Sequence, residues 1–215
     1  MATGSGTGTP ASAGSITKAQ VMTTIINRLR SLDVTIMDID EELRSTLYDI
    51  SSRDDFILES GTVTTVDGTA SYSLPTDFKH LDVAAVSSGN LLEPMTFNDY
   101  QRYIEDASSP TEGEPRYYAV RDKTVYFYPV PDTVYTVNIY YSNFHADSVD
   151  TIELGSVFRE AVYEGVLANL FKGQLSTVEG AMNHLGLHQQ LYEKEIGVRR
   201  DSLNKDPQYV KYNDI

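Results

Sequence analysis

The chain has 215 residues, of which 31 are acidic and 17 are basic, so its formal net charge is −14. This length allows one domain or two small ones. The absence of cysteine excludes disulfide scaffolds, thiolate metal sites and cysteine nucleophiles. The acidic balance argues against a protein whose main task is to grip nucleic acid phosphates. No stretch is apolar enough to predict a membrane span.

The N-terminal quarter predicts a flexible arm followed by two helices. Residues 1–14 are rich in Gly, Thr and Ser, and they cannot bury enough apolar surface to offset the entropy of ordering. Ser15 is predicted to cap a first helix, because its hydroxyl can accept hydrogen bonds from the first turn. Apolar residues at helical spacing predict a second helix over residues 35–52, with acidic residues crowding its first turns. The short Ser31–Val34 link indicates an antiparallel hairpin.

The pattern changes near Phe56, and residues 56–142 are typical of short strands separated by turns. Asp67-Gly68 predicts a tight turn with a strand on either side of it. Residues 97–106 predict a brief helix with one apolar side. Three further strands, spaced for a meander, are predicted at Tyr117–Arg121, Thr124–Tyr128 and Val134–Tyr141.

Helical periodicity returns at about residue 154. Two sets of residues mark one face each of a third and a fourth helix: Phe158, Ala161, Val162, Gly165 and Ala168, then Val178, Met182, Leu185, Tyr192 and Ile196. From Arg199 the period fails, and residues 199–215 are predicted to form an extended tail.

The order of elements predicts an α+β fold. Residues 15–55 and 150–198, from both ends of the chain, would form one discontinuous helical bundle. Residues 56–149 would form an inserted β-rich domain that is mainly antiparallel. The expected boundaries rest on the change of apolar period from 3.6 to 2 and back.

A search for chemistry assigns no catalytic, cofactor or metal residue. No phosphate loop or nucleophile elbow is present. His184 and His188 stand four residues apart on a predicted helix, a spacing that suits a metal, but no third ligand is evident. We interpret them as surface or interface histidines. The chain is therefore not predicted to be an enzyme, although a hydrolase that uses two carboxylates stays open as an alternative.

Acidic residues are concentrated in one part of the chain. Residues 31–67 hold ten acids and two bases, so this stretch contributes much of the negative charge. An acidic body with polar ends and no catalytic motif suits a component of an assembly. The alternative is that the acidity serves only solubility.

Three motifs in the middle of the chain resemble those of one known family. They are Tyr72-Ser-Leu-Pro-Thr-Asp-Phe78, Gly113-Glu-Pro-Arg-Tyr-Tyr-Ala-Val120 and Thr124-Val-Tyr-Phe-Tyr-Pro-Val-Pro-Asp132. Their types and order are similar to those of the head-to-tail adaptor, or connector, proteins of tailed bacteriophages. The motifs themselves consist of strand exits and turns, so they indicate structural residues and not catalytic ones.

The resemblance implies a structural virion protein at the head–tail junction, assembled in the host cytoplasm. It would form a ring, usually of twelve copies, below the portal protein. The ring would complete the head after DNA packaging and give the tail or later neck proteins an attachment surface. DNA would pass through it without specific binding. The main alternative is another tail or baseplate component, such as a module that binds glycans through its tyrosines.

The predicted tail keeps apolar side chains that an idle linker would not need. We therefore predict that it binds a partner, with the portal as the expected one, because tyrosines are common anchors at interfaces. The alternative is a frayed terminus. The candidate partner-binding residues are Arg199, Arg200, Lys205, Tyr209, Val210, Lys211, Tyr212 and Ile215.

Overall fold

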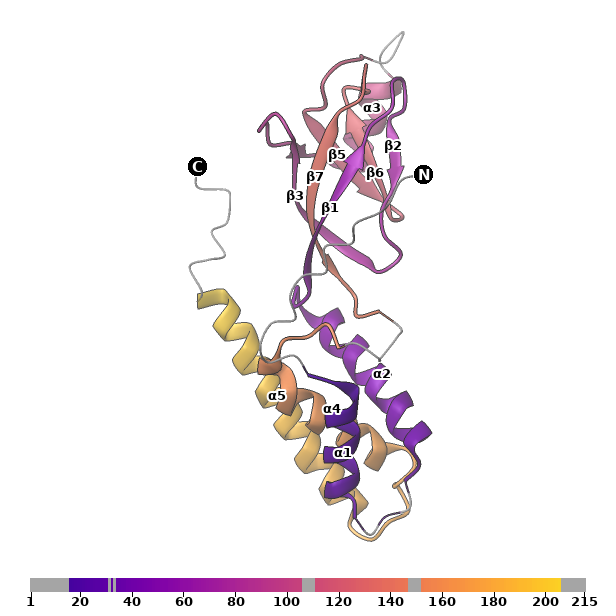
Figure 1. Cartoon of the computed structure of the whole chain (residues 1–215), viewed down its shortest axis with the longest axis vertical. Coiled ribbons are helices and arrows are strands. Elements are labelled where there is room, and N and C mark those ends of the chain that lie inside the picture. Colours follow the sequence, from indigo (N-terminus) through magenta and orange to yellow (C-terminus); the bar gives the residue numbers. More distant parts are fainter. Residues whose placement is uncertain (1–15, 31, 33, 106–110, 147–151, 206–215) are drawn as a thin grey trace, which may run out of the picture. The chain divides into compact units, whose positions relative to one another are not determined.

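A computed structural model describes residues 16–30, 32, 34–105, 111–146 and 152–205 (Figure 1). The chain divides into two compact units. One is Asp55–Phe144, named here the β unit. The other, the helical unit, contains the described residues that precede Asp55 and follow Phe144. The β unit begins one residue before the expected insert, residues 56–149, and ends five residues before the expected end of that insert.

The helices and strands confirm the α+β class. The helices are α1 (Lys18–Arg28), α2 (Ile36–Arg53), α3 (Phe97–Glu105), α4 (Arg159–Lys172) and α5 (Ala181–Lys205), with a short 3₁₀ helix, η1, at Ser156–Phe158. The strands are β1 (Leu58–Thr64), β2 (Ser71–Ser73), β3 (Phe78–Val86), β4 (Glu93–Pro94), β5 (Tyr117–Arg121), β6 (Thr124–Tyr128) and β7 (Thr136–Asn143).

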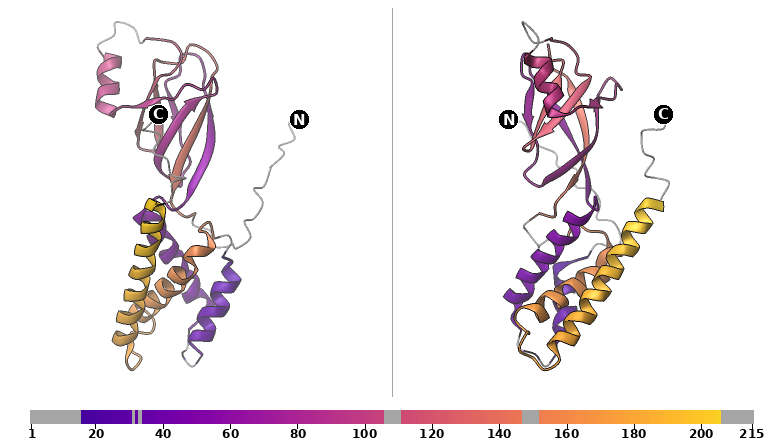
Figure 2. Two further views of the ribbon diagram at one scale, coloured as in Figure 1. Left: turned by 90° about the vertical axis from the view of Figure 1, so that its left-hand side faces the viewer. Right: turned by 180° about the vertical axis from the view of Figure 1, so that it is seen from behind.

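In the helical unit, α4 packs against α1, α2 and α5 (Figure 2). The sequence predicted one apolar face for α4, but the helix is buried on nearly all sides. A helix at the centre of a packed unit has no solvent side that would need polar residues. Gly165 lets α4 approach its neighbours closely, since a Cβ atom there would lie 2.5 Å from Cγ2 of Thr46 on α2 and 3.0 Å from Cε2 of Tyr192 on α5.

Both N-terminal helices begin with reciprocal caps. Ser15, the predicted cap, lies outside the described residues, and the observed cap of α1 is Thr17, whose hydroxyl accepts from the Gln20 amide. Thr35 caps α2 in the same way, and its hydroxyl lies 3.2 Å from the amide nitrogen of Asp38. The Asp38 carboxylate in turn accepts from the Thr35 amide at 2.9 Å. These hydrogen bonds satisfy amide groups that a helix leaves unpaired at its start.

Replacing Thr35 with alanine is expected to lower the free energy of unfolding of the helical unit by about 1 kcal/mol. The cap hydroxyl is lost, and the first-turn amide returns to water. Thr35→Ser keeps the hydroxyl and should stay close to the parent. Urea unfolding followed by circular dichroism at 222 nm measures both variants, and equal losses in the two would contradict the role of the hydroxyl.

The β unit contains two sheets, and their pairing corrects part of the sequence analysis. The orders are β1-β7-β3 and β2-β6-β5-β4, and every pairing is antiparallel except that between β4 and β5. The predicted turn at Asp67-Gly68 forms, with Gly68 at a φ of 69°. Its flanking strands β1 and β2 nevertheless belong to different sheets. The predicted meander is also wrong, because β5 and β6 pair whereas β7 pairs with β1 and β3.

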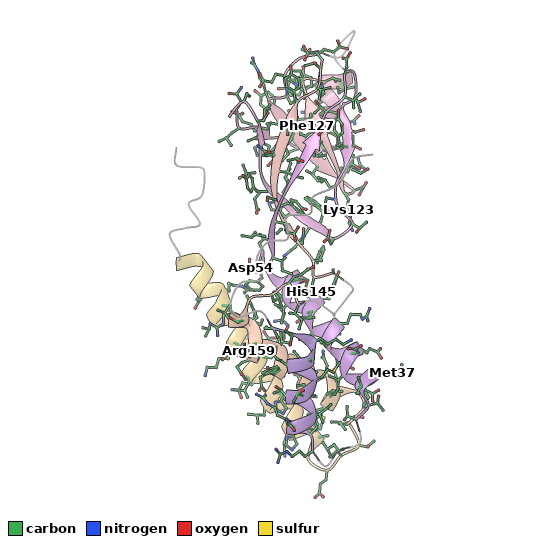
Figure 3. The ribbon with its side chains drawn as sticks, in the orientation of Figure 1. Met37, Asp54, Lys123, Phe127, His145 and Arg159 are labelled. Atoms are coloured by element: carbon green, nitrogen blue, oxygen red, sulfur yellow. The ribbon has the colours of Figure 1, made fainter. Side chains whose placement is uncertain are left out.

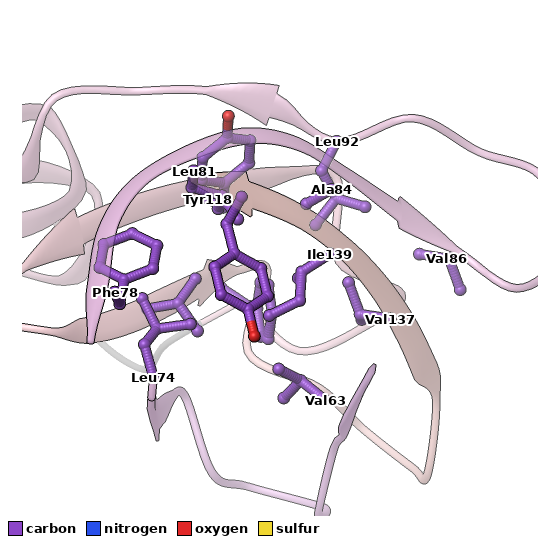
Figure 4. Packing of buried hydrophobic residues seen from close by; sticks show 13 residues of the cluster. Val63, Leu74, Phe78, Leu81, Ala84, Val86, Leu92, Tyr118, Val137 and Ile139 are labelled. Carbon is purple, nitrogen blue, oxygen red and sulfur yellow. The ribbon is translucent and has the colours of Figure 1, made fainter. Parts of the chain in front are cut away.

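An apolar cluster between the two sheets explains this pairing (Figures 3 and 4). Val137, Ile139 and Tyr141 of β7 alternate along the strand and are all buried in the cluster. They share this cluster with Phe127 of β6, which is fully buried. The core is therefore closed from both sides, with β7 at the centre of one sheet and β6 in the interior of the other. Strand β3 was not among the predicted strands, and it pairs with β7 along most of its length.

Candidate interaction surfaces

The structure describes only the beginning of the predicted partner-binding segment. Helix α5 continues to Lys205, so the extended tail predicted from residue 199 is wrong for residues 199–205. Nη2 of Arg199 lies 3.3 Å from Oε2 of Glu195, one turn earlier, and Nε of Arg200 lies 3.1 Å from Oδ2 of Asp54. These ion pairs support the helix where the apolar period fails.

The eight candidate residues are therefore not assembled into one described site. Arg199 and Arg200 are held by acids of their own chain. Lys205 is the last residue of α5, and its side chain is not described. The remaining candidates lie outside the described residues, namely Tyr209, Val210, Lys211, Tyr212 and Ile215.

A buried carboxylate links three helices of the helical unit. Oε1 of Glu164 on α4 lies 2.6 Å from Nη1 of Arg28 on α1, and its Oε2 lies 2.6 Å from Nδ1 of His188 on α5. Arg28 also reaches the more exposed Glu160 at 3.1 Å. Sequence patterns could not find this cluster, because Glu164 is 136 residues from Arg28 and 24 from His188.

The cluster changes the acidity of its members. Burial alone would raise the pKa of Glu164, but hydrogen bonds from His188 and Arg28 bring that pKa below its ordinary value. Burial would likewise lower the pKa of Arg28, whereas hydrogen bonds to Glu160 and Glu164 raise it. Both groups are therefore held in their charged forms, which is how a buried carboxylate becomes tolerable.

The two histidines that suited a metal by spacing have a packing role. The rings of His184 and His188 stack with the ring of Phe171, at centroid distances of 4.7 Å and 5.6 Å. Among the described residues, no group of three or more His, Asp or Glu side chains could hold a metal ion. His184 is exposed, whereas His188 is half-buried between Phe171 and Glu164.

A second polar cluster joins α2 to α5. The Tyr192 hydroxyl donates to Oδ2 of Asp49 at 2.5 Å, and the same oxygen accepts from Nε of Arg53 at 2.8 Å. Arg53 also reaches Glu193 at 2.7 Å and lies over the Tyr192 ring. Burial and the hydrogen bond to Asp49 raise the pKa of Tyr192. The residues form a cross-link between helices and present no free nucleophile.

Many acids of the 31–67 stretch are used inside the fold. Each of the following has a partner in its own unit: Asp38 with Thr35, Asp40 with Lys18, Asp49 with Arg53, Asp54 with Arg200, and Asp55 with Lys79. The last four of these contacts are ion pairs, so bases of the same chain lie beside part of the acidic stretch. The acidity therefore serves the fold as well as the surface.

Several tyrosines of the β unit are occupied in packing or in hydrogen bonds. Tyr100 and Tyr126 contact each other and Phe97, which fixes α3 to the sheet. Tyr103 stacks on Tyr128 at a centroid distance of 4.9 Å. Other hydroxyls hold turns, as the Tyr72 hydroxyl does by donating to the Thr69 carbonyl oxygen at 2.7 Å. A glycan platform would need several free ring faces, so this arrangement does not favour the glycan-binding alternative.

The comparison with known families covers nearly the whole described chain. The family model described as SU10 adaptor protein matches residues 16–210, which include both units. No curated protein matches the chain. Within the part of the chain that the structure describes, no helix is both long and apolar enough to cross a membrane. The chain therefore belongs to the SU10 adaptor protein family, in agreement with the resemblance of its strand and turn motifs to phage head-to-tail adaptors.

Proposed function

We propose that this phage structural protein is a head-to-tail adaptor that forms a closed ring below the portal. Identical subunits joined by one repeated heterologous contact close into a ring when the rotation permits, and about twelve copies would match a portal vertex. The ring would complete the filled head and give tail or neck proteins their attachment surface. No catalytic role is proposed for any residue.

The family match over residues 16–210 carries this proposal. The packing of the described polar side chains fits it, since the clusters around Glu164 and Tyr192 tie helices together. The net charge of −14 fits a ring that DNA passes without specific binding, because like charges repel phosphates within a Debye length of about 8 Å.

The direct test uses DNA-filled heads that bear portal but lack this protein. The purified chain should bind these heads and appear as a ring at a single vertex in electron micrographs, and the treated heads should then accept tails. Heads without portal are the control. Binding that is equally strong without portal, or copies scattered over the capsid, would count against the proposal.

We also propose that the segment after α5 contacts the portal. Removal of residues 206–215 keeps the whole of α5 and its ion pairs, so both units should fold unchanged. Binding to portal-bearing heads is expected to fall at least tenfold, because apolar anchors at an interface supply much of its affinity. Co-sedimentation measures the loss, and Tyr140→Ala, at an exposed tyrosine of β7, is the matched control. Unchanged binding by the shortened chain would place the contact in the folded units.

A further inference from the structure

Strand β1 is an outer strand of the sheet β1-β7-β3, and only one of its sides is paired (Figure 1). The amide of Asn143 donates to the carbonyl oxygen of Ile57 at 3.0 Å. The amide of Thr65 donates to the carbonyl oxygen of Tyr135 at 2.9 Å. The register between these two pairs is unbroken, so the odd-numbered residues of β1 form the hydrogen bonds to β7. The even-numbered residues therefore point their backbone groups away from β7.

These outward backbone groups have no partner in the part of the chain that the structure describes. They belong to Leu58, Ser60, Thr62 and Thr64, none of which forms a backbone hydrogen bond on that side. The side chains of all four residues are exposed. Strand β1 has no proline, lysine or bulge, and its only charged residue is Glu59. Such a row of amide and carbonyl groups is a template on which another extended segment can pair.

The other described edges of the two sheets are protected in ways that natural sheets commonly use. Strand β3 has two register shifts, and the chain that follows it covers its second half. There the amide of Val86 donates to the Asn90 carbonyl oxygen, and the amide of Leu92 donates to the Ala84 carbonyl oxygen. Strand β2 has three residues, and β4 has two, one of which is Pro94. The open edge of β1 is therefore a specific feature that calls for a partner.

A segment that suits this edge precedes α1 in the sequence. In residues 3–9, Thr or Ser alternates with Gly at every position, and Pro10 follows. Alternation with a period of two is the pattern of a strand, and seven residues is also the length of β1. Pro10 would end the pairing, because proline has no amide hydrogen to donate. Residues 10–15 would connect the added strand to Ile16 over a span of up to roughly 20 Å.

We propose that residues 3–9 of one copy pair as an added strand with the outer edge of β1 in the next copy. The inference rests on the proposed function, since it names a contact through which copies of this chain would assemble. Each copy has one such segment and one such edge, so the contact is heterologous and can repeat until the ring closes. The sequence analysis predicted a flexible arm here, and segments of that kind can order when they bind.

The side chains of the two strands are compatible. Residues 1–17 contain no charged side chain, so the segment adds no repulsion between copies that each carry −14 charges. Its hydroxyl side chains would lie beside Ser60 and Thr62 on the exposed face, and such cross-strand pairs stabilise sheets. Its glycines would lie on the opposite face, where the Tyr141 ring already occupies the space beside Gly61. Glycine needs no further room there.

The absence of native cysteine allows a direct cross-linking test. One chain carries Ser5→Cys and another carries Thr62→Cys, and an equal mixture of the two is bound to portal-bearing heads and treated with a short bismaleimide. A covalent heterodimer is expected, because only a contact between copies can join these two cysteines. The matched control replaces Thr62→Cys with Leu91→Cys, which is exposed beyond β3 at the opposite side of the same sheet. The control should give at least tenfold less heterodimer.

A second measurement blocks the edge without breaking the sheet. Thr62→Pro removes one outward amide but no hydrogen bond to β7, so the circular dichroism spectrum should stay unchanged. Thr62→Ala keeps the amide and is the matched control. Ring formation on portal-bearing heads should fall at least tenfold for Thr62→Pro and stay within twofold of the parent for Thr62→Ala.

Removal of residues 1–9 tests the other partner of the contact. This shortened chain keeps every residue that the structure describes, and its ring formation should fall as far as that of Thr62→Pro. The comparison keeps the inference testable even if the proline variant folds poorly.

Three outcomes would overturn the inference. The first is a heterodimer yield no higher than that of the Leu91→Cys control. The second is unchanged ring formation by the chain that lacks residues 1–9. The third is a chain with both Ser5→Cys and Thr62→Cys that cross-links only within itself, which would place the segment on its own sheet. In all three cases, rings formed by the parent chain would leave the proposed function standing, whereas a parent chain that forms no ring on portal-bearing heads would mean that the proposed function itself has failed.

Discussion

Replacing Glu164 with glutamine is expected to lower the free energy of unfolding of the helical unit by about 3 kcal/mol at neutral pH. The substitution keeps the shape of the side chain but removes the charge that Arg28 and His188 face inside the unit. Because the Arg28 side chain is 36% exposed, water can recover part of the loss, and the effect should lie at the lower end of the range for a broken buried pair.

Glu160→Gln is the matched control for this prediction. Glu160 contacts the same arginine, but its side chain is 54% exposed, so its removal should cost at most about 1 kcal/mol. Urea unfolding at 222 nm compares the two variants with the parent. Equal effects of the two substitutions would show that burial does not distinguish these carboxylates.

The contribution of Glu164 to the free energy of unfolding should also depend on pH in a defined direction. Its folded pKa lies below the ordinary value of 4.5, so the contribution is fully present above pH 4.5 and is lost as the pH falls through the folded pKa. The parent should therefore lose stability relative to Glu164→Gln as the pH falls below 4.5. If the difference in free energy of unfolding between the parent and Glu164→Gln stayed constant from pH 4.5 down through the folded pKa, the lowered pKa of Glu164 would be contradicted.

Replacing Gly165 with alanine should be as damaging, with an expected loss of about 3 kcal/mol. The new methyl group would lie 2.5 Å from Cγ2 of Thr46, which is almost completely buried and cannot move aside. It would also lie 3.0 Å from the ring of Tyr192. Helix α4 would have to shift away from α2 and α5 together, and the hydrogen bond between Tyr192 and Asp49 would be strained with it.

Gly186→Ala on α5 is the control for Gly165→Ala. It tests whether the expected loss of stability comes from steric contact with neighbouring helices or from placing alanine in a helix. A Cβ atom at Gly186 would meet nothing within 4 Å. Alanine is the better helix former, so this variant should gain about 0.5–1 kcal/mol. Urea unfolding gives both values. A gain for Gly165→Ala similar to that of Gly186→Ala would mean that the close helix approach does not limit this position.

Local sequence patterns identified much of the secondary structure for a simple physical reason. Residues 35–52 carry an apolar stripe at helical spacing behind a threonine cap, and α2 is observed at Ile36–Arg53. The strands β5 and β6 have the predicted bounds, since alternation and turn residues act between near neighbours in the chain. The motifs at 72–78, 113–120 and 124–132 also predicted the family, because turn residues at fixed spacing are local features.

Tertiary structure alone decided which strands pair and which charges meet. The Asp67-Gly68 turn predicted two neighbouring strands, but a turn does not determine pairing once each strand can bury its apolar side against a different sheet. The end of α5 depends on Asp54, which is 146 residues from Arg200 in the sequence. The same holds for Glu164, whose partners Arg28 and His188 lie on two other helices. Contacts between distant residues depend on how whole elements pack, and a one-dimensional pattern carries no record of that packing.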